Sequence, residues 1–107
     1  MRKAEQEKEN VRVIEAWDSF VSVVKDADDI GHAPAMRLRS CNAYVSCIGK
    51  WVVLTSFSTI VAILDSETRS LYDVLRYRYG YTATSAQHIA KFAHDYEVNE
   101  RHTWRVL

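Results

Sequence analysis

The sequence contains few of the residues that interrupt or cross-link a chain. Its 107 residues include one proline, three glycines and two cysteines. So few glycines exclude the glycine-rich loops that cradle phosphates, and no Cys-x-x-Cys pair is present to begin a zinc site or a dithiol redox motif. Cys41 and Cys47 fall within one expected strand, where residues six apart stand about 20 Å from each other, too far for a disulfide. We expect two buried free thiols, with a redox or metal role as the alternative.

The chain also lacks an excess of charge of either sign. Fourteen basic residues balance fourteen acidic ones, which argues against a protein whose main task is to wrap nucleic acid or to lie on an anionic membrane. The balance hides a split, because residues 1–35 carry eight acids and five bases (−3) and residues 36–107 carry nine bases and six acids (+3). The second part is therefore where an anionic partner is to be sought.

Long apolar runs are missing as well. No run approaches the ~18 residues of a membrane helix, and no charged-then-apolar leader opens the chain. We therefore expect no signal peptide, no membrane span and a cytoplasmic location. With 48% hydrophobic residues, a chain of this length suits one globular domain over residues 1–107. The first ten residues are expected to be a solvated helix start or a frayed end.

The spacing of the apolar residues changes clearly along the chain. Apolar residues at steps of three and four predict an amphipathic helix over 4–27, whose stripe packs on a sheet: Val13, Ile14, Trp17, Phe20, Val21 and Val24. The helix is expected to stop in the acidic stretch 26–31, and Pro34 keeps the following chain extended.

After Pro34 the period becomes two, which is typical of strands. Residues 36–48 and 51–64 form two runs joined by Gly49-Lys50, a two-residue link suited to a tight hairpin. A bend near 56–58 is expected to split the second run. Residues 71–79 predict a further strand after a polar turn, so short connections indicate an antiparallel meander.

The last part predicts a second helix and a final strand. Thr84 and Gln87 have the spacing of a capping box for a helix over 85–97, and residues 102–107 can add a strand. This helix would turn Ile89, Phe92, Ala93 and Tyr96 inward and His88, Lys91 and Asp95 toward water. The expected fold is α+β: an antiparallel meander of four to five strands with both helices packed on one face.

Four histidines raise the question of metal or acid–base chemistry: His32, His88, His94 and His102. His88 and His94 lie about 120° apart around a helix and cannot chelate one ion, so no metal and no cofactor are expected. His88 falls in the first helical turn, where backbone N–H groups can hold an anion; the alternative is that it caps the helix or packs on Tyr81 while exposed. Ser85 lies near His88, but helix capping explains that pair, and no nucleophile signature is present. We expect no enzyme.

The most unusual composition is the run from Arg76 to Tyr81. On a strand, Arg76 and Arg78 would share one face and Tyr77 and Tyr79 the other. Such arginines can solvate an open sheet face, form a protein interface, or bind single-stranded nucleic acid together with aromatic residues. The candidate binding residues are Arg76, Arg78, Tyr79, Tyr81, His88 and Lys91.

Residues 38–41, 56–62 and above all 73–96 resemble a family of small proteins carried by phages and mobile elements of gut bacteria. The shared block is a tyrosine, Thr-x-Thr-Ser, His and Phe after a hairpin, here Tyr81 to Phe92, and the similarity covers about 37–97. The family has no agreed activity, but proteins of this size and source include anti-CRISPR inhibitors. The resemblance therefore implies a non-catalytic accessory protein that binds and inhibits a host protein, such as a CRISPR effector.

Two classes of function follow from these observations. The first is that inhibitor, acting by occupying a host protein's surface; the alternative is a small nucleic-acid-binding module that uses the Arg/Tyr strand. The salt dependence of binding distinguishes the two classes. Affinity that rests on phosphate contacts falls steeply as the salt concentration rises, whereas that of a protein interface with buried aromatic residues does not. A second candidate surface is the acidic stretch of Asp26, Asp28 and Asp29, which can mimic a row of phosphates.

Overall fold

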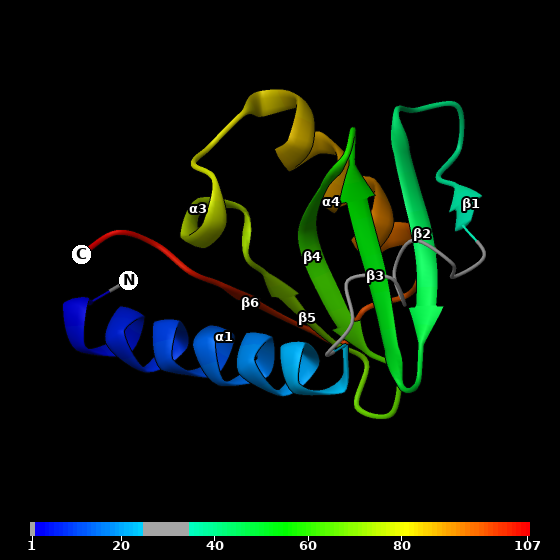
Figure 1. Ribbon diagram of the computed structural model, residues 1–107. Coiled ribbons are helices and arrows are strands. Elements are labelled where there is room, and N and C mark those ends of the chain that lie inside the picture. Colours follow the sequence, from blue (N-terminus) through cyan, green and yellow to red (C-terminus); the bar gives the residue numbers. More distant parts are fainter. Residues whose placement is uncertain (1, 25–34) are drawn as a thin grey trace.

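The computed structural model describes residues 2–24 and 35–107. The acidic stretch 26–31, His32 and Pro34 therefore lie outside the described residues. The elements follow the chain in the order α1 (Lys3–Val23), β1 (Ala35–Arg37), β2 (Ala43–Ile48), β3 (Trp51–Ser56), β4 (Thr59–Asp65), β5 (Ser70–Asp73), α3 (Leu75–Arg78), α4 (Ala83–Asp95) and β6 (Glu100–Thr103), as Figure 1 shows.

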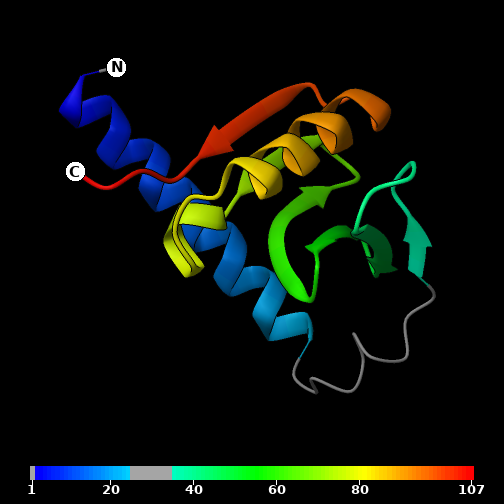
Figure 2. The ribbon, with the colours of Figure 1, turned by 90° about the horizontal axis from the view of Figure 1, so that it is seen from above.

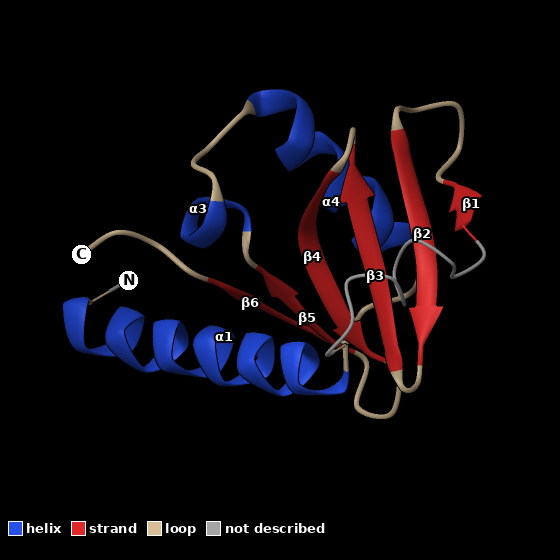
Figure 3. Cartoon of the chain, viewed as in Figure 1, coloured by secondary structure: helices blue, strands red, loops and turns tan. Residues whose placement is uncertain are grey.

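The strands form one six-stranded sheet in sequence order. Every neighbouring pair from β1 to β5 is antiparallel, whereas β6 runs parallel to β5 because α3 and α4 carry the chain back between them. Figure 3 shows the two helices on this connection. The α+β class is confirmed, with six strands instead of four or five and a last strand that departs from the meander.

Two predicted turns are confirmed and one predicted strand is divided. Ile48 pairs with Trp51 across the two-residue Gly49-Lys50 link, where Gly49 has a φ of +59°. The expected bend lies at Phe57-Ser58, which separates β3 from β4, and Phe57 has a φ of +59°. The run 36–48 is two strands, because the chain turns at 38–42 and β1 pairs back on β2.

The sheet has a core on each face. Neighbouring strand residues point to opposite faces, and Leu54 packs with Ile89 and Phe92 of α4 whereas Val53 packs with Phe20 of α1. The helices therefore cover opposite faces of the curved sheet instead of sharing one face; Figure 2 shows the strands curving between them. Most of the predicted α1 stripe is buried or half-buried, but Val21 is exposed.

The first turns of α1 are held in place by two amide side chains. Gln6 and Asn10 are buried. Gln6 Nε2 donates to the Thr103 carbonyl at 3.0 Å, and Asn10 both donates to the Arg105 carbonyl at 2.7 Å and accepts from its N–H at 2.9 Å. Of the two expectations for residues 1–10, the solvated start of a helix fits residues 3–10, most of which are exposed. Gln6 and Asn10 are the buried exceptions, because they pack beside the chain that continues β6.

The predicted strand 71–79 is wrong beyond Asp73. The Asp73 carboxylate accepts a hydrogen bond from the Leu75 N–H at 3.1 Å, and the Arg78 N–H donates to the Val74 carbonyl at 3.0 Å. These bonds begin a helical turn, α3, which places Leu75 in the core. Arg76 and Arg78 consequently do not share the face of a strand.

The predicted second helix exists but begins earlier. Thr82 caps α4, its hydroxyl accepting from the Ser85 N–H at 3.3 Å, so the predicted box at Thr84 is not the cap. Ile89 and Phe92 are fully buried as expected. His88 is also buried, which contradicts its expected position toward water.

Candidate functional site

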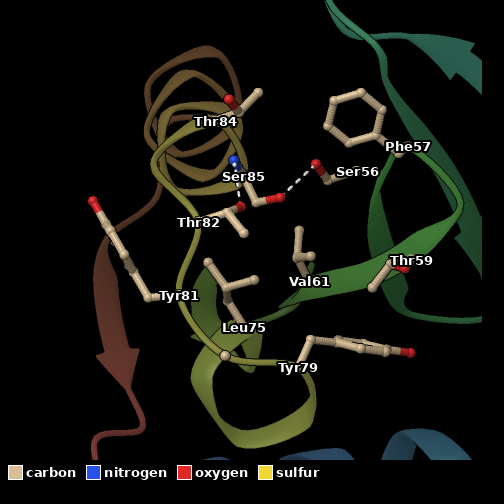
Figure 4. Close-up of a pocket in the computed structure, with 11 residues that line it drawn as sticks. Ser56, Phe57, Thr59, Val61, Leu75, Tyr79, Tyr81, Thr82, Thr84 and Ser85 are labelled. Carbon is tan, nitrogen blue, oxygen red and sulfur yellow. Dashed lines mark hydrogen bonds between the residues drawn. The ribbon is translucent and has the colours of Figure 1, made fainter.

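A hollow of about 460 Å³ lies between the β3–β4 hairpin and the segment that joins α3 to α4. Figure 4 shows its residues as sticks around the open space. The lining residues are Ser56, Phe57, Thr59, Val61, Leu75, Tyr79, Gly80, Tyr81, Thr82, Thr84 and Ser85. None of these is charged, so the hollow combines apolar surface with hydroxyl groups.

Three aromatic side chains stand around this hollow. Phe57, Tyr79 and Tyr81 are 56%, 55% and 57% exposed, whereas Val61 and Leu75 beneath them are buried. Phe57 projects from the tight hairpin turn, and the two tyrosines flank Gly80, which has a φ of +101°. We call Phe57, Tyr79 and Tyr81 the aromatic rim.

Arg76 and Arg78 are held against aromatic rings. The Arg76 guanidinium lies 4.5 Å from the centre of the Tyr81 ring. The Arg78 guanidinium lies 4.2 Å from the Trp17 ring and 4.7 Å from the Tyr79 ring, and donates to the Ile60 carbonyl at 3.3 Å. Neither arginine forms an ion pair with a described residue. Stacking leaves both positive charges beside the rim and restrains the two tyrosines.

A chain of polar groups lies at the inner end of the hollow. Ser56 Oγ is 2.9 Å from Ser85 Oγ and 2.8 Å from His88 Nδ1, and all three residues are buried. Burial, and then the nearby positive Lys91, lower the pKa of His88 below its ordinary value. The lowered pKa favours the neutral imidazole near pH 7, whose Nδ1 accepts from Ser56 when its proton is on Nε2 and donates to Ser56 in the other tautomer.

The six predicted binding residues separate into three groups. Tyr79 and Tyr81 line the hollow, and Arg76 and Arg78 stack on them. His88 is buried, which contradicts its expected exposure, and its ring centre lies 5.8 Å from that of Phe57. Lys91 points elsewhere, its Nζ donating to Cys41 Sγ at 3.2 Å.

The cysteines are free, as expected, but they are not both buried. Cys41 is half-buried in the turn between β1 and β2, and Cys47 is exposed on β2. The expectation of two buried thiols is therefore wrong for Cys47 and holds only in part for Cys41. Cys47 lies near the end of β2, and the division of the predicted strand places Cys41 in the turn before β2.

Sequence reasoning missed Ser56 and Phe57 as site residues. A signal for Phe57 was present, since a large aromatic residue in a tight turn between two serines has little core to enter. Ser56 gave no such signal, because its partners stand 29 and 32 residues further along the chain.

The described histidines each contact a protein group. His102 Nδ1 lies 2.9 Å from a Glu9 oxygen, and His94 Nδ1 lies 3.3 Å from an Asp95 oxygen. Within residues 2–24 and 35–107, no three His, Cys, Asp or Glu side chains are grouped so as to hold a metal ion. Over the same ranges, no helix has the length and apolar character needed to cross a bilayer.

Comparison with family models, curated proteins and solved structures found no match to this chain.

Proposed function

We propose that this chain is a binding protein that occupies the surface of a partner protein through the aromatic rim and the adjoining Arg76 and Arg78. The observation that carries the proposal is the exposure of Phe57, Tyr79 and Tyr81 around one hollow with an apolar floor. Aromatic residues and arginine dominate the energetic centres of protein interfaces.

The rim has the features of a surface prepared for a partner. A tyrosine held by a stacked guanidinium loses little freedom on binding, so less free energy is spent on ordering it. Arg76 and Arg78 add positive charge beside a hollow without charged lining, which favours a partner segment that presents an apolar side chain next to a carboxylate.

The narrower identity of the partner stays a prediction. The resemblance of residues 73–96 to proteins of phages and mobile elements favours a host protein in the cytoplasm as the target, with a CRISPR effector as one such target. The nucleic-acid alternative is weakened by the loss of the Arg/Tyr strand, because Arg76 and Arg78 lie on a helical turn, where they do not form a strand face.

The test is capture of a partner from a bacterial host lysate by the immobilised chain, with and without nuclease, followed by mass spectrometry. Tyr79→Ala with Tyr81→Ala should reduce recovery of a specific protein at least tenfold, and capture should survive nuclease and 0.5 M salt. Tyr44→Ala is the matched control, since Tyr44 is exposed on β2 and points away from the α4 face.

Two outcomes would count against the proposal. If the double variant recovers as much partner protein as the wild type, the aromatic rim is not part of the interface. Recovery that disappears with nuclease or moderate salt would favour nucleic acid as the ligand.

A further inference from the structure

The Ser56–His88 pair has the geometry of an activated hydroxyl. A serine is a weak nucleophile at neutral pH unless a base within hydrogen-bond reach takes its proton. Ser56 Oγ lies 2.8 Å from His88 Nδ1, within the distance needed for direct proton transfer. Burial lowers the pKa of His88, which favours the neutral imidazole, and in the tautomer with its proton on Nε2 the Nδ1 that faces Ser56 accepts.

The surroundings of Ser56 favour the negative charge that develops on a carbonyl oxygen beside it. The hydroxyl lies 2.9 Å from Ser85 Oγ, and Ser85 belongs to the first turn of α4, a helix of 13 residues. The first N–H groups of a helix have no acceptor within it and carry partial positive charge. Ala83 and Thr84 supply such groups, beside the hollow that Thr84 lines. The N-terminal end of α4 therefore favours negative charge in the hollow that Ser56 and Ser85 line.

The hollow itself defines what can reach Ser56. Both Ser56 and Ser85 line it, and Val61 and Leu75 give it an apolar floor. Its volume of about 460 Å³ is within the usual range for small-molecule sites. Because no lining residue is charged, an uncharged acyl group is accommodated better than an ionised one.

We propose that Ser56 is a nucleophile, with His88 as its general base, toward small uncharged carboxylic esters bound in the hollow. Ser56 Oγ forms a bond to the ester carbonyl carbon while its proton passes to His88 Nδ1. The bond from that carbon to the alcohol oxygen then breaks, and the alcohol leaves with the proton. Water, deprotonated by the same imidazole, hydrolyses the acyl-serine to a carboxylic acid and restores the Ser56 hydroxyl. This activity is independent of the proposed protein partner.

The expected turnover is slow. Among the described residues no carboxylate hydrogen-bonds His88 to fix its orientation, and losing that third group costs about 10⁴-fold in kcat in a serine triad. The covalent adduct is accordingly a better readout than product formation.

The experiment incubates the whole chain with a fluorophosphonate, and separately with p-nitrophenyl butyrate, and measures intact mass and a peptide map. We expect one adduct, located on Ser56, in the folded protein. Labelling should stop in Ser56→Ala and slow at least 100-fold in His88→Asn, which keeps an acceptor for the Ser56 hydroxyl but no base. Ser58→Ala, an exposed serine in the same hairpin outside the hollow, should label at the wild-type rate.

The labelling rate of the wild type should also fall as the pH drops below the His88 pKa, because a protonated imidazole cannot accept. Absence of an adduct on the folded wild type overturns the proposal, as does an adduct mapped to Ser85 or to a tyrosine. If His88→Asn is labelled at the wild-type rate, His88 is not the general base. The peptide map of the wild-type adduct tests whether Ser56 is the nucleophile even if a variant fails to fold. Failure of partner capture does not affect this test, because the labelling needs no partner.

Discussion

Asn10 provides the most direct test of how α1 is attached to the sheet. Its side chain takes part in three hydrogen bonds: from Gln6 Nε2 at 2.8 Å, to the Arg105 carbonyl at 2.7 Å and from the Arg105 N–H at 2.9 Å. In Asn10→Ala all three are lost. At about 0.5–1.5 kcal/mol net for each bond, the three together contribute about 1.5–4.5 kcal/mol.

The lower end of that range applies, because Arg105 is exposed and water can replace part of the lost bonding. We therefore expect the free energy of unfolding to fall by about 2 kcal/mol, which lowers the Tm of a domain of this size by about 8–15 °C. Circular dichroism melts, together with urea unfolding at constant m-value, measure both quantities.

A second substitution at the same position separates bonding from volume. Asn10→Asp keeps the size and the acceptor but turns the donor that faces the Arg105 carbonyl into a repelling oxygen, so it should destabilise at least as much as Asn10→Ala. Asn42→Ala is the control, since Asn42 is exposed and should change the Tm by no more than about 2 °C. A Tm for Asn10→Ala within 2 °C of the wild type would refute the attachment described here.

Three further outcomes are expected. Phe92→Ala should lower the free energy of unfolding by about 3–5 kcal/mol, because it empties a fully buried site in the core under α4; a wild-type melting curve would contradict that packing. Hydrogen bonding from Arg39 lowers the pKa of Asp95 from 3.8 to about 2 in the folded protein. The pair therefore stabilises the fold at pH values above the unfolded pKa, and this contribution is lost as the pH falls through the folded pKa. Carboxyl NMR titration should show the Asp95 midpoint rising toward 3.8 in Arg39→Leu, and an unchanged midpoint would exclude the pair. The exposed Cys47 should react with a thiol reagent in the folded protein within minutes, and protection until denaturation would place it inside.

Elements governed by local pattern could be predicted from the sequence. The apolar spacing from Val13 to Phe20 marked α1, and the Gly49-Lys50 link marked the hairpin that joins β2 to β3. In these segments the residues that determine the structure stand within a few positions of each other, so hydrophobic periodicity and turn chemistry suffice.

The strand expected over 71–79 failed because two local signals compete there. The alternation of arginine and tyrosine imitates a half-buried strand, but the Asp73 carboxylate captures the Leu75 N–H and starts a helical turn. Asp73 also pairs with Arg101 at 3.1 Å, a contact made across 28 residues. Arg101 therefore holds the Asp73 carboxylate where it accepts from the Leu75 N–H, and residues close to Asp73 in the sequence do not reveal this partner.

The sequence predicted only part of the candidate site, because the rest depends on residues that are far apart in the sequence. Tyr79 and Tyr81 could be selected because their composition is unusual, and both line the hollow. The buried chain of Ser56, Ser85 and His88 depends on the β3–β4 hairpin meeting the start of α4. Serine and histidine are common on solvated surfaces, so nothing in their spacing marks them as neighbours.

The attachment of Gln6 and Asn10 to residues 103–105 has a consequence for synthesis on the ribosome. These bonds join positions 95–97 residues apart, so the amides of α1 have no partners until almost the whole described sequence has been translated. Strands β2 to β4 pair in succession and can assemble while synthesis continues, since their contacts are close in sequence. During that interval the apolar stripe of α1 can pack on Trp51, Val53 and Ile63, whereas its first turns have no surface to pack on until β6 is synthesised.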